Sequence, residues 1–124
     1  GAGAGGVGLA CAALGAEHVV ITDISEAALS LCHDNVARNP RLAPRVSVAP
    51  CAWGDGPAIE ALSRLPGGGG SGGGFDVVIA SEVVYKQEAE VLRALAATQA
   101  RLARADARVL LAYEFRGELF DDLA

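Results

Sequence analysis

The sequence predicts an α/β fold, organised as a doubly wound and mostly parallel sheet. Two observations lead to this prediction. Short apolar runs of strand type alternate with helix-type segments along the chain, and the strand candidates are apolar on both faces, as is typical of strands that helices cover on both sides. The 124 residues, of which 52% are hydrophobic and 20% charged, suffice for one domain with a buried core.

The chain opens with a glycine-rich turn over residues 1–8, which leads into a short helix that is apolar nearly all round and ends at Gly15. Residues 18–23 are a β-branched run that closes on an acid, and this pattern predicts a strand. Ser25 is the expected N-cap of a second helix, because its hydroxyl can accept a hydrogen bond from a backbone amide of the first turn. Pro40 follows the end of that helix.

The second half of the chain continues the alternation. A glycine-rich tract, GGGGSGGG at residues 67–74, predicts a flexible loop insertion because it can bury nothing. Around it the pattern predicts strands at 45–49, 75–80 and 108–113 and helices at 57–64 and 87–104.

We expect the domain to be truncated at both ends, so that residues 1–124 form a partial domain. A glycine-rich ligand loop normally follows a strand, and here Gly1 opens the chain. The strand expected before Gly1 would lie at the centre of a doubly wound sheet. This leads to the hypothesis that the 124-residue segment does not fold stably by itself.

The composition of the chain limits the classes of molecule that it is expected to bind. Ten Lys and Arg against fifteen Asp and Glu give a net charge of −5, which disfavours nucleic acid. No apolar run approaches the roughly 20 residues of a transmembrane helix, so no membrane partner is expected, and the expected location is the cytoplasm, with the nucleus as the alternative. Cys11, Cys32 and Cys51 lack any CxxC spacing and are interpreted as reduced, buried thiols. His18 and His33 stand at no ligand spacing to them, so no metal site is expected.

The opening segment GAGAGG, residues 1–6, fits both a GxGxG and a GxGxxG pattern, in which missing side chains let a ligand touch the backbone. By itself this motif is weak. Asp23 strengthens it, since an acid at the end of the next strand, about 20 residues on, is placed to accept hydrogen bonds from ribose hydroxyls. Together they predict an adenosine-containing cofactor. The competing interpretation is that the glycines allow close helix packing and that Asp23 caps a turn near Ser25.

Trp53, the only tryptophan, follows the strand at 45–49 in the segment CAWGD. Its flat indole is suited to cover an adenine, and Asp55 could bound the same pocket. The alternative is a tryptophan packed at the base of a loop. The type of cofactor stays open at this point, because a dinucleotide places its pyrophosphate on the helix N-terminus, whereas a sulfonium nucleoside carries no phosphate.

A second polar cluster, ASEVVY at residues 80–85, stands at the carboxyl end of the strand at 75–80, where ligands bind in open α/β sheets. Glu82 and Tyr85 place an acid and a phenol beside the expected reactive end of the cofactor. Taken singly, each also has a structural interpretation, Glu82 as a helix-entry residue and Tyr85 as a packing residue. Glu114 and Arg116, after the last strand, belong either to the substrate side or to a solvated strand end, and are left out of the predicted site.

Five segments, in this order and spacing, resemble the seven-strand protein methyltransferases of the methyltransferase-like 21 group, also called family 16: GAGAGGVGLACAALGA, VVITD, CAWGD, FDVVIASEVVY and LAYEFR. The resemblance covers nearly the whole chain. Its most specific parts are the Trp-Gly pair and the acid-x-x-Tyr motif that runs from Glu82 to Tyr85. It implies a Rossmann-like seven-strand methyltransferase fold, S-adenosylmethionine as the cofactor, and a lysine side chain of a protein as the substrate.

The resemblance also implies roles for individual residues. Many family members carry Asp where this chain has Glu82, which leaves the assignment standing but weakens any inference about the substrate. The implied roles are contact with the methionine part of the cofactor for Gly1, Ala2 and Gly3, with the ribose for Asp23, with the adenine for Trp53, a place in the pocket wall for Ser81, and catalytic roles at the substrate channel for Glu82 and Tyr85.

Methyl transfer from a sulfonium is an in-line displacement, so the protein chiefly positions the reactants. The attacking lysine must be neutral, and a free lysine has a pKa of about 10.4. The expected device is an apolar channel that disfavours the ammonium form, with Tyr85 or Glu82 aiding positioning or proton loss.

Three alternatives remain at this point. The first is an oxidoreductase domain that binds NAD(P) or FAD, which the GxGxxG reading and Asp23 support but which leaves Trp53 and the Glu82–Tyr85 motif unexplained. The second is an inactive methyltransferase-like binding module. The third is a methyltransferase that acts on a small molecule, a nucleic acid or a different protein side chain such as histidine, which would share the cofactor half of the site.

Overall fold

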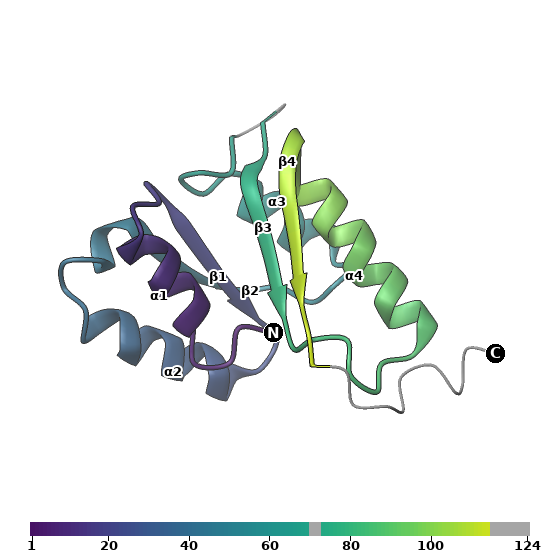
Figure 1. Ribbon diagram of the computed structural model, residues 1–124, viewed down its shortest axis with the longest axis horizontal. Helices are drawn as coiled ribbons and strands as arrows, with labels where there is room; N and C mark the ends of the chain where they lie inside the picture. Colours follow the sequence, from purple (N-terminus) through teal and green to yellow (C-terminus); the bar gives the residue numbers. More distant parts are fainter. Residues whose placement is uncertain (70–72, 115–124) are drawn as a thin grey trace.

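The computed structural model describes residues 1–69 and 73–114 of the chain (Figure 1). Helices and strands alternate along it, as the sequence predicts. The elements, in chain order, are α1 (Gly6–Ala13), β1 (Val19–Asp23), α2 (Glu26–Ala37), the short 3₁₀ helix η1 (Ala43–Arg45), β2 (Val46–Pro50), α3 (Gly56–Ser63), β3 (Phe75–Ser81), α4 (Ala89–Leu102) and β4 (Ala103–Ala112).

Most predicted boundaries are confirmed within a residue or two, and the differences have local causes. Ser25 is the N-cap of α2, with its Oγ accepting a hydrogen bond from the amide of Ala28 at 3.4 Å. Helix α1 begins at Gly6, inside the predicted glycine-rich turn, because Gly5 supplies the left-handed conformation that starts it. Strand β4 begins at Ala103, directly after α4 and earlier than the predicted residue 108. Of the glycine-rich tract, residues 70–72 lie outside the described residues.

The strands of the described chain form two parallel pairs. Strand β1 pairs with β2, with Val19 opposite Val46 and Asp23 opposite Pro50. Strand β3 pairs with β4, with Ser81 opposite Ala112, and the register shifts between Phe75 and Val77. The prediction of a parallel α/β arrangement is therefore confirmed, while the described strands make two separate two-stranded sheets in place of one continuous sheet.

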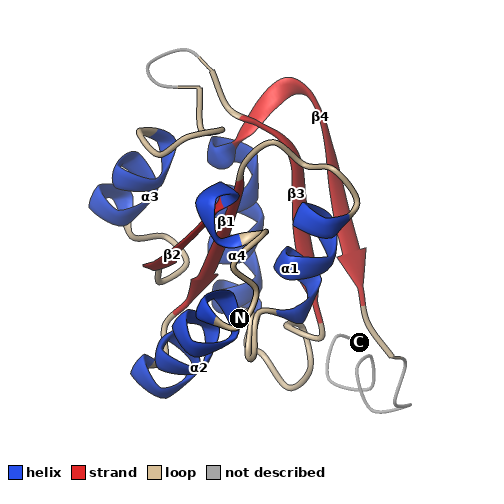
Figure 2. Cartoon of the chain, turned by 90° about the vertical axis from the view of Figure 1, so that its left-hand side faces the viewer, coloured by secondary structure: helices blue, strands red, loops and turns tan. Residues whose placement is uncertain are grey.

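Helices pack beside each pair. Helices α1 and α2 contact β1, and α4 contacts β3 and β4. In Figure 1, α1 and α2 lie to the left with β1, whereas α4 lies to the right of β3 and β4. Figure 2, turned by a quarter, shows α1 in front of β3, with α2 and α3 toward the side of β1 and β2. The first residue lies at the carboxyl ends of β1 and β3, which brings the glycine-rich turn to the edge where the strands end.

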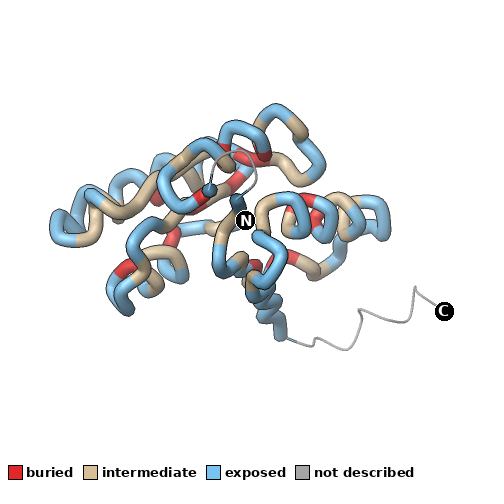
Figure 3. The backbone as a smooth tube through the Cα atoms, turned by 90° about the horizontal axis from the view of Figure 1, so that it is seen from above, coloured by how far each residue is buried: buried red, intermediate tan, exposed pale blue. Residues whose placement is uncertain are grey.

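The core consists of two small clusters rather than one large one, as the scattered buried segments in Figure 3 show. One joins Cys51 to Ile59 and Leu62 of α3, and the other joins Ala80 and Val83 to Leu95 of α4. The second cluster also packs against Trp53. Since Cys51 and Trp53 belong to the same loop after β2, that loop rests on both clusters.

The expectation that helices cover both faces of every strand is wrong for β3 and β4 in the described chain. Leu110 is 49% exposed and Val77 is 46% exposed. Side chains alternate across a strand, and the register places Val77 and Ile79 beside the partners Arg108 and Leu110 on one face. Helix α4 packs on the opposite face, which carries the buried Ala80. No helix of the described chain has the length and apolarity to cross a membrane.

Candidate functional site

A cavity of about 630 Å³ lies where the strands end. Its walls come from the glycine-rich turn, the loops that follow β1, β2 and β3, and the start of α4. The lining residues are Gly1, Ile24, Cys51, Ala52, Trp53, Glu82, Val83, Tyr85, Gln87, Val91 and Ala94. Segments far apart in the sequence therefore meet at one site, at the edge of the sheet where ligands bind in parallel α/β folds.

The structure brings together four of the residues that the sequence singles out, since Gly1, Trp53, Glu82 and Tyr85 all line this cavity. The other four are not among its lining residues. Ala2 and Gly3 continue the turn that begins at Gly1, and Ser81 is the last residue of β3. Asp23 lies directly behind the wall, because the next residue, Ile24, lines the cavity.

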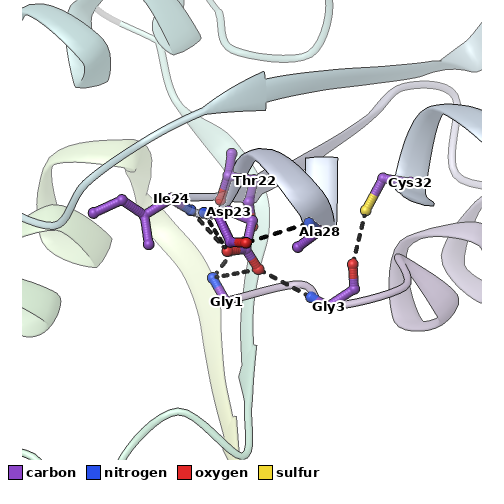
Figure 4. Close-up of polar contacts among 8 residues, drawn as sticks. Gly1, Gly3, Thr22, Asp23, Ile24, Ala28 and Cys32 are labelled. Carbon is purple, nitrogen blue, oxygen red and sulfur yellow. Dashed lines mark hydrogen bonds and ion pairs between the residues drawn. The ribbon is translucent and has the colours of Figure 1, made fainter. Parts of the chain in front are cut away.

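The Asp23 carboxylate is the centre of the turn's hydrogen bonds (Figure 4). Its Oδ1 accepts bonds from the amides of Ile24 at 2.8 Å and Ser25 at 2.9 Å. Its Oδ2 accepts one from the amide of Gly3 at 3.0 Å and lies 3.7 Å from the nitrogen of Gly1. A carboxylate offers about four acceptor positions, so Oδ2 keeps capacity for a further donor.

Asp23 is only 6% exposed, yet it stays ionised. Burial by itself would raise the pKa of its carboxyl group, but the hydrogen bonds from the amides of Ser25 and Gly3 outweigh burial, and the pKa lies below its ordinary value of 3.8. The turn is therefore built around a fixed negative charge.

The glycines of the turn have different structural roles. Gly3 has a φ of +56°, and a Cβ added to it would meet no atom within 4 Å, so its position is open toward solvent or a ligand. Gly8 has the opposite surroundings, because an added Cβ would lie 2.5 Å from Cγ1 of Ile21. Close packing of α1 on β1 thus explains Gly8, while the left-handed backbone explains Gly3. Within the motif itself, a Cβ added to Gly5 would lie 3.1 Å from Sγ of Cys32, so the packing interpretation is confirmed there, and the ligand interpretation stays a prediction.

Two side chains of helix α2 contact the backbone of the glycine-rich turn. The thiol of Cys32 contacts the carbonyl oxygen of Gly3 at 3.2 Å, and Nδ2 of Asn35 donates to the carbonyl oxygen of Ala4 at 2.9 Å. Cys32 is fully buried, and burial raises the pKa of its thiol. The sequence pattern gave no hint of these two contacts, because Cys32 and Asn35 look like ordinary positions on a helix.

The three cysteines are unpaired, as predicted. Cys32 and Cys51 are buried, whereas Cys11 is only partly buried, so the prediction of a buried thiol is wrong there. Burial raises the pKa of Cys51 as well. Within residues 1–69 and 73–114, no three His, Cys, Asp or Glu side chains gather in a way that could hold a metal ion.

Trp53 forms one wall of the cavity and packs on the cluster of Ala80, Val83 and Leu95. The turn continues through Gly54, whose φ is +85° and whose amide donates to Oγ1 of Thr98 at 2.8 Å. Asp55, which the sequence suggested as a boundary of the pocket, lines a smaller adjoining cavity of about 250 Å³ that shares Ile24, Cys51 and Ala52 with the main one. Its Oδ1 caps α3 by accepting a bond from the amide of Ala58 at 3.1 Å, and Asp55 is not among the residues that line the main cavity.

Glu82 and its neighbours line another part of the same cavity, next to the cluster on which Trp53 packs. Glu82 has a φ of +54° and Lys86 a φ of +51°, a backbone region that residues other than glycine rarely adopt and that gathers at functional sites. The amide of Glu82 donates to the carbonyl oxygen of Ala112 at 2.8 Å, and its Oε1 accepts from the amide of Glu114 at 2.5 Å. The carboxylate is thereby tied to the end of β4.

Tyr85 lines the same part of the cavity, and Lys86, which is not among the lining residues, lies over its ring. Nζ of Lys86 lies 5.3 Å from the centre of the Tyr85 ring, a cation–π contact. Glu114 enters the site only as the backbone donor to Glu82, and Arg116 lies outside the described residues.

Sequence reasoning missed the contribution of α4 and the residues before it. Gln87, Val91 and Ala94 line the cavity. Val91 and Ala94 are three positions apart on one face of α4, but apolar residues at such spacing indicate a core face equally well. Gln87 precedes the helix and carries no such signal.

Comparison with known protein families decides the class. A family model described as lysine methyltransferase, family 16, matches residues 1–121 of the chain. The chain belongs to this family. No curated protein matches it.

Membership of the lysine methyltransferase family confirms the resemblance inferred from the sequence and assigns the chain to the methyltransferases. The family match spans both walls of the cavity, from Gly1 to beyond Tyr85. The candidate site of this methyltransferase is therefore the cavity that the start of the glycine-rich turn, Trp53 and Tyr85 line together.

Proposed function

We propose that this protein transfers a methyl group from S-adenosylmethionine to a lysine side chain of a protein substrate. The observation that supports the proposal best is the composition of the cavity of about 630 Å³, whose lining combines the start of the glycine-rich turn and Trp53 with Glu82 and Tyr85. One side is suited to a nucleoside and the other to a polar acceptor, as a group transfer between two bound molecules requires.

The residues fit a nucleoside without phosphate better than a dinucleotide. In a dinucleotide site, the amides of the glycine-rich turn and the start of the next helix receive the pyrophosphate. Here the amide of Gly3 is already bonded to the Asp23 carboxylate at 3.0 Å. A pyrophosphate would meet this negative charge, whereas a sulfonium cation would be attracted by it.

The cofactor residues are assigned from this geometry and the family. Oδ2 of Asp23 has capacity to accept a hydrogen bond from a ribose hydroxyl. Trp53 offers a flat apolar face for the adenine. The backbone of the turn, with Gly1, Ala2 and the open position at Gly3, would hold the methionine part, and Ser81 would support the wall at the end of β3. When bound, the cofactor supplies a methyl group activated by a positively charged sulfur.

The substrate residues are assigned to the part of the cavity that the segment after β3 and the start of α4 line. Val83 and Val91, both at the cavity, give it an apolar lining that disfavours an ammonium ion and so favours the neutral amine. Tyr85 places a phenol there as a hydrogen-bond partner for the amine. The carboxylate of Glu82, held by the amide of Glu114, is positioned to assist loss of the amine proton.

Three finer statements belong to the same proposal. The two parallel pairs are parts of a Rossmann-like, seven-strand sheet, which the family match and the parallel pairing support. The partner is a protein rather than nucleic acid or membrane, consistent with the net charge of −5. The protein acts in the cytoplasm, with the nucleus as a second location.

The test is calorimetric binding of S-adenosylhomocysteine and of NAD to the full-length protein. We expect binding of the nucleoside and none of NAD, and a loss of affinity in Asp23→Ala and Trp53→Ala. Stacking on an aromatic side chain is worth about 1–3 kcal/mol per base, so Trp53→Phe should retain most of the affinity that Trp53→Ala loses. Glu17→Gln, at an exposed position before β1, is the matched control and should bind as the wild type does.

Other outcomes would replace the proposal. Binding of NAD would refute the cofactor assignment, and binding of neither molecule would favour an inactive binding module. Methyl transfer is then followed by mass spectrometry on candidate protein substrates. Lys86 is the only lysine in the sequence, so Lys86→Arg removes any signal from methylation of this part of the enzyme itself. Methylation of histidine in place of lysine would overturn the substrate assignment while leaving the cofactor assignment intact.

A further inference from the structure

Thr98 stands out among the polar residues outside the lining of the cavity. It lies in the interior of α4 and is only 4% exposed. Its Oγ1 donates a hydrogen bond to the carbonyl oxygen of Ala94 at 2.8 Å and accepts one from the amide of Gly54 at 2.8 Å. The second bond joins residues 44 positions apart in the sequence.

A buried hydroxyl in the middle of a helix needs an explanation. Threonine has a lower helix propensity than alanine, and an unpaired buried hydroxyl costs about 1–3 kcal/mol. The bond to Ala94 uses only the hydroxyl's proton and stays within the helix. The bond from Gly54 uses the oxygen and is the one that leaves the helix. A valine of nearly the same shape would lose this bond together with the bond to Ala94.

Gly54 is the residue through which this bond reaches the site. It directly follows Trp53, and its φ of +85° marks the point where the chain turns away from the indole. An added Cβ at Gly54 would lie 3.5 Å from Cβ of Ala94, which itself lines the cavity. The turn is therefore seated closely against α4.

Trp53 is held from two directions as a result. Its indole packs on the cluster of Ala80, Val83 and Leu95, while the backbone that follows it is fixed by Thr98. The apolar contact limits where the indole can lie, and the directional hydrogen bond limits how the turn can rotate.

We propose that Thr98 is a positioning residue for the cofactor, because it fixes the Trp53–Gly54 turn and with it the angle of the indole that faces the nucleoside. The inference rests on the proposed function for the identity of the nucleoside, but its structural part concerns this turn alone. Thr98 touches neither cofactor nor substrate and acts through Gly54 and Trp53.

The test compares Thr98→Val, which keeps the shape and removes the hydrogen bond, with Thr98→Ser, which keeps the hydroxyl. Loss of one such bond is worth about 0.5–1.5 kcal/mol, so Thr98→Val should weaken binding of S-adenosylhomocysteine up to about tenfold. The KM for S-adenosylmethionine should rise by a similar factor, with kcat at saturating cofactor within about twofold of the wild type. Thr98→Ser should restore wild-type affinity.

Two further measurements separate positioning from mere stability. In a Trp53→Ala background, Thr98→Val should no longer change the affinity, because the residue through which it acts is gone. The fluorescence of Trp53, isolated by difference against Trp53→Phe, should shift to longer wavelength in Thr98→Val without ligand and stay unchanged in Thr98→Ser. If Thr98→Val is too unstable to purify, Thr98→Ala, a better helix former, replaces it.

The proposal is overturned if Thr98→Val lowers the melting temperature while affinity and Trp53 emission stay at the wild-type values, or if its effect on affinity persists in the Trp53→Ala background. Failure of the proposed function is distinguishable from this. A wild-type protein that binds no S-adenosylhomocysteine would refute the cofactor, whereas the emission of Trp53 would still decide whether Thr98 fixes the turn.

Discussion

The two walls of the cavity are built on different principles. On one wall, the glycine-rich turn is fixed by a buried carboxylate that accepts hydrogen bonds from the amides of Gly3, Ile24 and Ser25. On the other wall, the segment from Glu82 to Lys86 holds two non-glycine residues with positive φ and connects to β4 through Glu82. The first wall is shaped before any ligand arrives. The second carries backbone strain at its functional residues.

This difference fits the tasks that the two walls would have. A cofactor is the same in every reaction cycle, and a site prepared in advance avoids the cost of ordering the turn on binding. A substrate lysine arrives on a protein and must be admitted and released. Strained backbone at such a site is a frequent feature of functional segments. The comparison predicts that substitutions on the first wall change cofactor affinity and those on the second change turnover.

The largest effect is expected for Asp23→Asn, which keeps the shape of the side chain. An amide group offers one acceptor oxygen and two donors, so it cannot accept from the three backbone amides that now bind the carboxylate. Hydrogen bonds to charged groups contribute about 1.5–3 kcal/mol, and we expect the affinity for S-adenosylhomocysteine to fall about a hundredfold by calorimetry. Unchanged affinity would show that the turn does not depend on its central charge.

Gly8→Ala should have the next largest effect, on stability rather than binding. The new methyl group would lie 2.5 Å from Cγ1 of the buried Ile21, and overpacking of this kind costs about 1–3 kcal/mol. Gly3→Ala is the matched comparison. It meets no neighbouring atom and carries only the cost of a positive φ, but its methyl group would enter the space of a ligand.

Denaturant unfolding and calorimetry on both glycine variants separate the two roles of the motif. Gly8→Ala should lose more free energy of unfolding, and Gly3→Ala should lose more cofactor affinity. The reverse pattern would mean that the packing interpretation of the motif applies to Gly3 and the ligand interpretation to Gly8.

Glu82→Gln and Tyr85→Phe test the catalytic roles assigned to the second wall. Each keeps the size of the side chain and removes the group assigned to positioning or proton loss. We expect each to lower kcat about a hundredfold, at the lower end of the range typical of general acid–base groups, and to leave the affinity for S-adenosylhomocysteine within about twofold. If both variants turned over at the wild-type rate, Glu82 and Tyr85 would be structural residues and the catalytic assignment would be wrong.

Much of the fold could be predicted from the sequence, because its signals are local. The β-branched run that ends at Asp23 and the cap at Ser25 depend on neighbouring residues, and both are confirmed. The start of β4 could not be predicted, because it follows α4 without a loop or a turn residue to mark it. The exposure of Val77 and Leu110 could not be predicted, because an apolar pattern indicates a strand with apolar faces but does not indicate which element packs on each face.

The candidate site could also be predicted only in part. The motifs named Asp23, Trp53, Glu82 and Tyr85, since glycine turns, acids at strand ends and lone aromatic residues are visible in a sequence. The bonds from Gly54 to Thr98 and from Asn35 to Ala4 join distant segments, and no spacing rule reveals them. The competing interpretation of Asp23, as the cap of a turn near Ser25, is confirmed by its bonds from the amides of Ile24 and Ser25, whereas its bond from the amide of Gly3 came only from the structure.

The smallest effect is expected for Lys86→Gly, which tests whether the second wall is strained at all. A positive φ costs a non-glycine residue about 1 kcal/mol, while the exposed cation–π contact with Tyr85 returns about 0.5 kcal/mol. A new glycine also costs about 0.5–1 kcal/mol through the added freedom of the unfolded chain, so Lys86→Gly should leave the free energy of unfolding unchanged or lower it by up to about 0.5 kcal/mol. This loss is about 0.5 kcal/mol smaller than that of a glycine substitution at a position without a positive φ. Gln87→Gly, at the next exposed position and without a positive φ, is the control and should be destabilising by about 0.5–1 kcal/mol. If both variants lose the same stability in urea unfolding, the left-handed backbone at Lys86 stores no strain, and the contrast between the two walls reduces to their hydrogen bonds alone.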